Sequence, residues 1–588
     1  MKSFLKYVLA TITGIAVVFV LLFFILVAVI SSTVSQMGSS TEANVPNNAV
    51  LYVSLNHVIS ERTAASPWEG IDLPGYGAVK SLGLNDIVAR IQAAKEDSRI
   101  KGIYFNPSSV NAGMATVKAI REALVDFKKS GKFIIAYSDV YTQKGYYLAS
   151  VADSIYMNPE GSLDFKGLSS SVTFLKEALD KLGVDMQVVK VGTYKSAVEP
   201  FLLNEMSAAN REQMTSYLNS TYDAFLANIA EGRKIPADSL RAIADNYLIR
   251  NADDAKRYKF IDDKLYKDEL LTLMKKRLGV EEKKDIPTIS LLDYSTPAKT
   301  ESATDRVAVL YAYGDIVDGE GSEGSIGGEK LSRELRKLRR DDRVKAVVLR
   351  VNSPGGSALA SDIIAREVEL TKKVKPVVVS MGDYAASGGY YISALADSIF
   401  AEKETLTGSI GVFGLIPNMK GLLNNKLGIH MDEVKTGKFA DLMTSVDRPL
   451  TAEEYTIVQA EVNRVYHTFT SKVSTGRKMT VAAVDSIGQG RVWTGQQAVA
   501  NGLVDGIGGL QRAINSAAAK AKLKTYRTVE YPAVKDPFAS ILSTSKEKIK
   551  MWVIGEELGE YRAYIEQLRT VTKRSGIQAR VPYSLEIK

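Results

Sequence analysis

The sequence contains no cysteine and only three histidines among its 588 residues. The absence of cysteine excludes disulfides, thiolate nucleophiles and cysteine-ligated metal centres. The histidines, His57, His430 and His467, form no H-E-x-x-H or similar ligand spacing. We therefore expect neither a metal nor another cofactor. The shortage of histidine also restricts the choice of a general base for any nucleophile.

Long runs of one charge are missing as well. The net charge of +8 arises from 75 basic and 67 acidic residues spread along the chain. No stretch interleaves basic and aromatic residues, so nucleic acid is not expected as a partner. The charge balance favours an anionic membrane surface only weakly.

One apolar run is long enough to span a membrane, at residues 7–30. It carries no charge, and at ~1.5 Å per residue it crosses a hydrocarbon core of ~30 Å. Lys2 and Lys6 precede it, which predicts residues 1–6 in the cytoplasm and the remaining chain outside. The alternative is a cleaved signal peptide, whose apolar region is typically only about 7–15 residues. We expect an uncleaved single-pass anchor in the cytoplasmic membrane of a bacterium, followed by a polar linker over 31–48.

The remaining chain contains one unit twice. GYYLASVADSIYMNPE, from Gly145, matches GYYISALADSIFAEKE, from Gly389, 244 residues later. IKGIYF, from Ile100, matches VKAVVL, from Val344, at the same offset. Self-similarity over this distance indicates a duplicated structural unit. It predicts four parts: a first repeat over 49–294, a linker over 295–306, a second repeat over 307–525 and a C-terminal extension over 526–588.

Within each copy, short apolar runs alternate with amphipathic stretches. KAVVLRV and KPVVVSM are rich in β-branched residues, as expected of strands buried on both faces of a parallel sheet. The segment between them places Ile363, Ile364 and Val368 on one face of a helix. The succession of strand, helix and strand predicts an α/β fold of two tandem βαβ repeats after the N-terminal transmembrane helix.

Two glycine-containing turns follow predicted strands in the second copy. NSPGGS, residues 352–357, exposes backbone N–H groups at Gly355 and Gly356. ASGGY, residues 386–390, puts Ser387 at the start of a predicted helix, GGYYISALA. Unpaired N–H groups and the dipole at a helix N-terminus favour a developing oxyanion. Together the turns can supply a nucleophile and two N–H donors to one carbonyl oxygen.

Ser387 also has a simpler interpretation, as an ordinary helix N-cap. The first copy argues against it, because Gln143 stands at the position of Ser387 and Lys144 at that of Gly388. A residue that serves only the fold would be expected in both copies. The asymmetry favours a functional site in the second copy.

A serine nucleophile needs a base, and lysine is the common alternative to histidine. The ordinary pKa of lysine is about 10.4, so the amine must be buried or lie near other cations to be neutral. Lys195, in QVVKVGTYKSAVEPF, is predicted on a short apolar strand. Alignment of VGTYK with TGKFA puts Ala440 opposite it. Each copy thus lacks the group that the other contains, which predicts one site assembled from both.

Five motifs together resemble the signal peptide peptidase A family in its long, two-repeat form: NSPGGS, ASGGYY, LTGSIGVFG, GRVWTG and YKSAVEPF. The resemblance extends from Val50 to about Arg527. It implies a crotonase- and ClpP-like fold in each repeat and a homotetrameric, bowl-like assembly. It also implies a serine endopeptidase that hydrolyses cleaved signal peptides and other extended apolar peptides.

The resemblance implies roles for single residues. Ser387 is the expected nucleophile and Lys195 its general base. Ser409, in the TGS segment, is expected to hold the lysine, with a plain turn residue as the alternative. Single-repeat relatives carry their lysine in the segment that is here 437–440, so Lys438 is the alternative base.

The expected oxyanion donors are backbone N–H groups. They map to Gly388 and to the pair Gly355 and Gly356. The glycine-rich segment 319–330 lacks the GK[ST] ending of a phosphate loop. We expect it to be a mobile surface segment that covers the groove in which the resemblance places the catalytic sites.

Two other functions use the same fold. A crotonase-like acyl-CoA enzyme also has a Gly-Gly oxyanion hole, but it needs neither a serine at Ser387 nor an extracytoplasmic location. A non-catalytic membrane scaffold would not require Ser387 and Lys195 to persist in complementary copies.

Overall fold

The computed structural model describes residues 7, 13–15, 17–18, 21, 45–63, 81–295, 303–322, 324–533 and 577–581. Within these ranges no helix combines the length and the apolar composition needed to cross a bilayer. The expected anchor over 7–30 and most of the expected C-terminal extension lie largely outside them.

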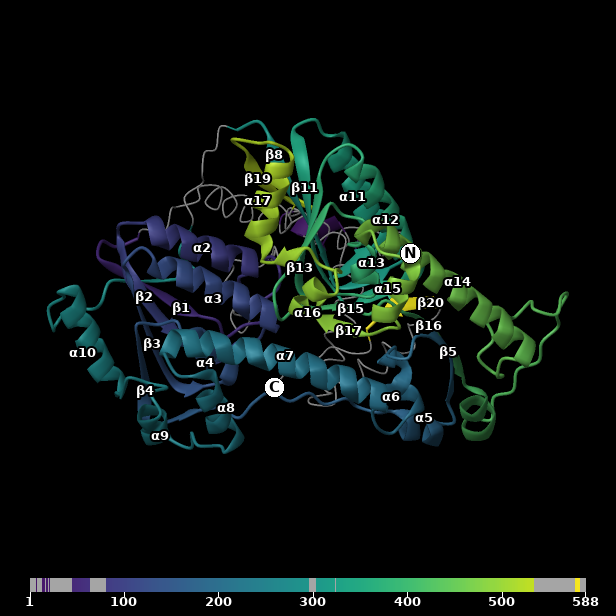
Figure 1. The fold of residues 1–588 in the computed structure, drawn as a ribbon, viewed down its shortest axis with the longest axis horizontal. Helices are drawn as coiled ribbons and strands as arrows, with labels where there is room; N and C mark the ends of the chain where they lie inside the picture. The colour runs from purple at the N-terminus through teal and green to yellow at the C-terminus, as the bar shows by residue number, and fades with distance from the viewer. Residues whose placement is uncertain are drawn as a thin grey trace.

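The described residues form three sheets, and the first belongs to the N-terminal half (Figure 1). Its strands are all parallel, and their spatial order is β6 (Asp263–Lys264), β4 (Ser154–Leu163), β3 (Phe133–Tyr141), β2 (Ile100–Asn106), β1 (Ala49–Ser54) and β7 (Thr288–Ser290). The helices of this half are α2 (Leu84–Glu96), α3 (Met114–Lys128), α4 (Gln143–Ala149), α5 (Lys176–Leu182), α6 (Glu199–Leu202), α7 (Ala208–Arg233), α8 (Ala237–Asp245), α9 (Ala252–Arg257) and α10 (Lys267–Leu278).

A second large sheet forms in the C-terminal half. Its strands are, in spatial order, β17 (Val492–Thr494), β15 (Leu406–Gly408), β13 (Val377–Ala386), β11 (Val344–Ser353), β8 (Arg306–Tyr313) and β19 (Arg527–Tyr531). In addition, β14 (Ser398–Ala401) pairs with β13, and β18 (Gly506–Ile507) pairs with β14. The helices here are α11 (Gly328–Arg340), α12 (Ala358–Lys372), α13 (Gly388–Tyr391), α14 (Ala452–Arg477), α15 (Val481–Ile487), α16 (Gly495–Ala500) and α17 (Leu510–Lys520). Strand β11 is central and buried on both faces, as its β-branched sequence predicts.

The two halves repeat the same elements. Helix α14 begins and ends 244 residues after α7, and α12 stands in the same relation to α3. In each half the order of the central strands is the same, with β3, β2 and β1 matching β13, β11 and β8. The α/β fold with an internal repeat, predicted from the sequence, is therefore confirmed.

The third sheet joins the halves and is mixed rather than parallel. Its order is β10 (Ser325–Gly327), β9 (Asp315–Val317), β12 (Gly355–Ser357), β20 (Ile577–Arg580), β16 (Val412–Asn418) and β5 (Asp185–Val191). Strand β5 of the first half pairs antiparallel with β16 of the second over seven residues. This pairing carries the chain that follows β5 into the second half.

Further contacts hold the halves together. Helix α7 extends from the first sheet, below β17, toward α6 (Figure 1). Its Ser220 and Ser216 contact Thr494 and Gln497. Arg350 of β11 forms a buried, two-pronged ion pair with Glu61, at 2.8 and 3.1 Å. The halves therefore share a buried interface.

Two local expectations differ from the structure. The glycine-rich segment 319–330 is not a loop throughout, because β10 and the start of α11 lie within it. Strand β19 falls inside the expected C-terminal extension, but it pairs with β8 as an edge of the second large sheet. The first difference comes from the pairing of β10 with the nearby strand β9, and the second from the long-range pairing of β19 with β8.

Candidate active site

Ser387 lies at the turn between β13 and the single helical turn α13. Its backbone has φ of +55°, an uncommon conformation for a residue with a side chain. The Ser387 N–H donates to the Gly408 carbonyl at 2.8 Å, which fixes the turn against β15. Strain of this kind persists where the surrounding structure imposes it, and it is frequent at functional sites.

The hydroxyl of Ser387 does not cap α13. The N-cap interpretation therefore does not describe this serine. Its Oγ instead lies 2.9 Å from Nζ of Lys195, and both side chains are fully buried. The predicted helix GGYYISALA is also shorter than expected, because α13 ends at Tyr391.

Lys195 reaches Ser387 from a turn and not from a strand. Strand β5 ends at Val191, and Lys195 immediately precedes the 3₁₀ turn Ser196–Val198. The backbone of this turn is held by a bond from the Tyr194 N–H to the Gln489 carbonyl, at 2.8 Å. The prediction of a strand position for Lys195 is wrong, although its proximity to Ser387 is as expected.

Burial lowers the pKa of the Lys195 amine well below its usual value. Removal from water disfavours the ammonium form, and no carboxylate among the residues that the structure describes has an opposing effect on this pKa. Besides Ser387, the amine contacts the Ser409 Oγ at 3.1 Å and the Ser409 carbonyl at 3.4 Å. All of these neighbours are uncharged oxygens, which suit a neutral amine.

Ser409 follows β15 and is itself in a left-handed conformation, with φ of +50°. Its N–H donates to the Arg491 carbonyl at 2.7 Å, and its side chain is fully buried. The hydroxyl therefore has a fixed position beside the Lys195 amine. A plain turn residue would not need that contact.

Gly490 was missed as a site residue, although it begins the GRVWTG motif. Its φ is +78°, and a Cβ atom built on it would lie 2.7 Å from Cα of Lys195. Only glycine therefore allows the two backbones to approach so closely. Neither its distance from other motifs in the sequence nor the composition of the surrounding segment distinguishes Gly490 from the other glycines of the chain.

Gln213 of α7 is a second residue that the sequence did not indicate. Its Nε2 donates to the Tyr194 carbonyl and to the Ser196 hydroxyl, each at 3.0 Å. Its Oε1 accepts from the Val492 N–H at 3.1 Å. One buried amide thus ties the lysine turn of the first half to β17 of the second.

The glycines expected around an oxyanion lie together. The Gly388 N–H is the first of α13 and has no partner within that helix. A Cβ built on Gly355, whose φ is +103°, would lie 2.8 Å from Gly388 N. The Gly355 N–H itself donates to the Ser353 hydroxyl at 3.2 Å, and Gly356 pairs with Ala579 of β20 and Ile316 of β9. The structure thus brings Gly388 and Gly355 side by side.

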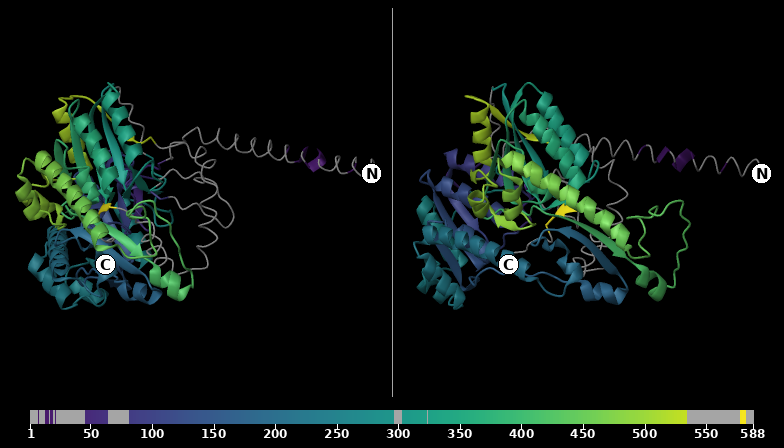
Figure 2. Two further views of the ribbon diagram at one scale, coloured as in Figure 1. Left: turned by 90° about the vertical axis from the view of Figure 1, so that its right-hand side faces the viewer. Right: turned by 45° about the vertical axis from the view of Figure 1, so that its right-hand side comes forward.

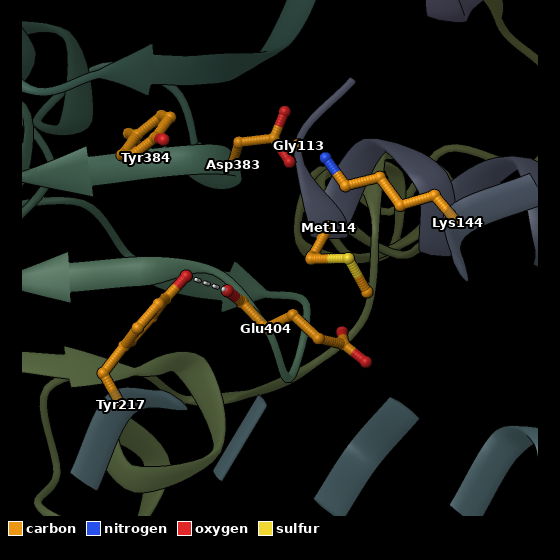
Figure 3. A pocket seen from close by; sticks show the side chains of 7 residues that line it. All are labelled: Gly113, Met114, Lys144, Tyr217, Asp383, Tyr384 and Glu404. Carbon is orange, nitrogen blue, oxygen red and sulfur yellow. Dashed lines mark hydrogen bonds between the residues drawn. The ribbon is translucent and has the colours of Figure 1, made fainter. Parts of the chain in front are cut away.

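The corresponding turn of the first half has different contacts. The Gln143 amide accepts from the N–H groups of Lys166 and Gly167 and donates to the Gly167 carbonyl. Lys144 donates to the Ala112 carbonyl at 2.8 Å, and its amine points into a small pocket toward Asp383 (Figure 3). Hydrogen bonds to neighbouring backbone therefore occupy both side chains.

The alternative base, Lys438, lies elsewhere. Its side chain is 67% exposed and pairs with Glu453. The segment around it forms turns instead of the strand that would have aligned it with Ala440. Lys438 therefore does not join the cluster of Ser387, Lys195 and Ser409.

Among the residues with described positions, no group of three or more His, Asp or Glu side chains could hold a metal ion.

Comparison with known proteins connects this geometry to a family. The sequence profile of peptidase family S49 matches residues 126–281 and 369–524, once in each half. Protease 4 of Haemophilus influenzae is 38% identical over 516 residues, which cover 85% of this chain and 83% of the relative. The chloroplastic serine protease SPPA of Arabidopsis thaliana is 33% identical, over 91% of this chain and 78% of its own length.

A solved structure, that of a ClpP1 mutant from Listeria monocytogenes, is 16% identical with a TM-score of 0.24. It covers 35% of this chain and 94% of its own, and a score this low supports no inference about the fold of either repeat. The family assignment rests instead on the profile matches in both halves and on the relatives that span most of the chain. This chain belongs to peptidase family S49, as a serine peptidase of the Protease 4 type.

Proposed function

We propose that this peptidase cleaves peptide bonds with Ser387 as nucleophile and Lys195 as general base. The observation that carries the proposal is the 2.9 Å contact between the Ser387 hydroxyl and a fully buried lysine amine. A base must lie within hydrogen-bond reach of the proton that it removes and be unprotonated at the working pH. Burial that lowers the pKa of Lys195 supports the second requirement.

The chemistry follows from these positions. Neutral Lys195 takes the Ser387 proton as Oγ attacks the substrate carbonyl carbon, and the carbonyl oxygen becomes an oxyanion. The Gly388 N–H stabilises that oxyanion by a hydrogen bond. The Lys195 ammonium then gives its proton to the departing amine nitrogen, which leaves an ester on Ser387. A water molecule, deprotonated by Lys195, hydrolyses the ester and restores both groups.

Ser409 is assigned a positioning role. Its hydroxyl lies 3.1 Å from the Lys195 amine and 0% of the residue is exposed. A lysine side chain has several rotatable bonds, so a fixed oxygen beside the amine favours the rotamer that reaches Ser387. The hydroxyl also accepts a hydrogen bond from the ammonium formed during the reaction.

The substrate and the cellular location extend the proposal. Extended apolar peptides, cleaved signal peptides among them, are the proposed substrates, and a homotetramer is the proposed assembly. Residues 7–30 are the proposed anchor, which would hold the site at the outer face of the cytoplasmic membrane. Fractionation of cells with the full chain and with a chain lacking residues 1–30 tests the anchor. If both chains were found in the membrane fraction in equal proportion, the anchor would be contradicted.

The catalytic proposal is tested with a fluorophosphonate probe and mass-spectrometric location of the adduct. We expect the adduct on Ser387 and none on the Ser387→Ala variant, while circular dichroism shows that the variant remains folded. Ser398→Ala changes a serine of β14 that pairs with Val378 near the start of β13, away from Ser387, and this control should label like the wild type. Hydrolysis of a casein substrate by Ser387→Ala at the wild-type rate would refute the assignment.

A further inference from the structure

The segment GRVWTG, residues 490–495, lies against two of the turns that form the proposed site. Its Gly490 packs against the backbone of Lys195. The carbonyl of Arg491 accepts the Ser409 N–H at 2.7 Å, and β17 then pairs antiparallel with β15, the strand that precedes Ser409. The backbone of this segment therefore connects the lysine turn with the turn that holds the lysine amine.

The side chain of Arg491 extends this connection to the residue before the lysine. Its guanidinium donates to the Tyr194 hydroxyl at 3.2 Å and pairs with one oxygen of the Glu212 carboxylate at 2.9 Å. The Tyr194 hydroxyl donates to the other oxygen of Glu212 at 3.1 Å. These three side chains form a closed ring of contacts, which we call the arginine clamp.

The clamp joins the two halves of the molecule. Tyr194 and Glu212 belong to the first half, and Arg491 to the second. Helix α7, which contains Glu212, lies beside β17 (Figure 1), and Figure 2 shows the purple and blue first half packed against the teal and green second half. The guanidinium also lies 4.7 Å from the centre of the Tyr194 ring and 4.5 Å from that of Trp493. A planar guanidinium can stack on rings and bind a carboxylate at once, which an ammonium cannot do.

A lysine that acts as a base depends on such a clamp more than a charged lysine does. An ion pair can hold an ammonium in place, whereas a neutral amine has to be placed largely by its backbone. Lys195 stands in a short turn, where its own N–H donates to the Gly192 carbonyl at 3.2 Å. A displacement of a reacting group by about 1 Å can cost ~10²-fold in rate. The position of this turn therefore decides whether the amine reaches the serine.

Stability is a weaker reason for the clamp. The Glu212 side chain is 55% exposed and that of Arg491 22% exposed. Ion pairs with this much exposure contribute little to the stability of a fold. The precise geometry of the ring of contacts is therefore better explained by the position of the lysine turn.

We propose that Arg491 is a positioning residue for the general base Lys195. Its clamp holds Tyr194 and thereby the turn from which the amine reaches Ser387. Because the clamp joins both halves, it also makes the placement of the base depend on their docking. This inference rests on the proposed roles of Ser387 and Lys195.

Replacement of Arg491 by methionine tests the proposal in the full chain. Methionine keeps an unbranched apolar stem but removes the guanidinium. We expect kcat for a fluorogenic peptide to fall about ten- to a hundredfold with KM unchanged. A released turn lets water reach the amine, so the pKa of Lys195 moves back toward its usual value. The acidic limb of the profile of kcat/KM against pH should consequently move to higher pH.

Two further arginine variants separate positioning from general damage. Arg491→Lys keeps a positive charge without the planar fork and should have an intermediate kcat. Arg339→Met is the matched control, because the Arg339 side chain is also 22% exposed and pairs with Glu367 at 2.7 Å, on α11 and α12. It should leave kcat and the pH profile unchanged.

A double variant shows whether the two side chains act through one clamp. Tyr194→Phe removes the hydroxyl and should lower kcat less than Arg491→Met does. Arg491→Met/Tyr194→Phe should be no slower than Arg491→Met alone, because effects within one network do not add. If circular dichroism shows that Arg491→Met does not fold, Tyr194→Phe and its pH profile decide the question.

Three results would overturn the inference. They are an unchanged kcat in folded Arg491→Met, a loss of kcat without a shift of the acidic limb, and losses that multiply in the double variant. In each case, labelling of Ser387 by the fluorophosphonate in the wild type leaves the proposed function standing. If the wild type neither labels at Ser387 nor hydrolyses peptides, the proposed function fails and this inference fails with it.

Discussion

Replacement of Lys195 by methionine is expected to abolish peptide hydrolysis and to stabilise the folded protein at the same time. Methionine has a similar length and volume and suits a site with 0% exposure, so it removes the amine without a large cavity. Loss of a general base should lower kcat/KM by at least ~10²-fold. The gain in stability follows from the cost of burying the amine.

The magnitude can be worked from the surroundings of the lysine. To hold an amine neutral at pH 8 against an ordinary pKa of about 10.4 costs roughly 3 kcal/mol, at about 1.4 kcal/mol per pH unit. The lost contacts with Ser387 and Ser409 offset about 1–2 kcal/mol of that gain. We therefore expect the free energy of unfolding of Lys195→Met to exceed that of the wild type by roughly 1–2 kcal/mol at pH 8.

The pH dependence gives the sign of the effect. The folded pKa of Lys195 is lowered, so the unfolded wild type binds a proton that the folded form lacks until the pH approaches 10.4. Wild-type stability consequently rises with pH over this window, and the advantage of Lys195→Met shrinks. Denaturant unfolding at pH 8 and pH 10 measures the free energy of unfolding of the wild type and of Lys195→Met. Lys190→Met, which changes an exposed lysine of β5, is the control. An advantage that grows with pH, or a variant less stable than the wild type at pH 8, would refute the reasoning.

Three further changes have definite expected outcomes. Gly490→Ala forces a Cβ atom against the Lys195 backbone at a positive φ, and a displacement of the amine by about 1 Å should lower kcat by ~10²-fold in a peptide-hydrolysis assay. Arg350→Met leaves Glu61 buried without its guanidinium partner and should cost about 3–5 kcal/mol in denaturant unfolding. Burial, and to a lesser extent the neighbouring Glu404, raise the pKa of Glu402 from 4.5 to about 7. The contribution of Glu402 to the free energy of unfolding is therefore fully present below pH 4.5 and is lost as the pH rises through 7. Glu402→Gln should recover roughly 3 kcal/mol at pH 8 and nothing at pH 4.

Matched controls separate these effects from general damage. Gly437→Ala adds a Cβ in open space and should leave kcat unchanged. Arg366→Met removes an exposed ion pair with Glu369 and should change stability by less than ~1 kcal/mol. If Gly490→Ala is as active as Gly437→Ala, the close approach at Lys195 is not needed for catalysis. Equal stability of the two arginine variants, or a pH-independent gain in Glu402→Gln, would contradict the corresponding prediction.

Much of the fold could be predicted from local sequence patterns. The apolar strands, the amphipathic helices and their recurrence after 244 residues are properties of short segments, and both halves contain them in the same order. Comparison of the copies also selected Ser387 and Lys195, because Gln143 and Ala440 replace them at the matching positions. The sequence by itself therefore determined the α/β repeat and the two residues that approach within 2.9 Å.

Only the tertiary structure decided how these residues meet. Pairing of β5 with β16 carries Lys195 across to Ser387, and Gln213 and Gly490 hold its turn from two distant elements. Insertion of β20 into the central sheet joins strands that lie far apart in the sequence. Such contacts depend on the burial and strand pairing of the whole chain, which no local pattern encodes. The loss of water around Lys195, and with it the lowered pKa of the amine, follows from that packing alone.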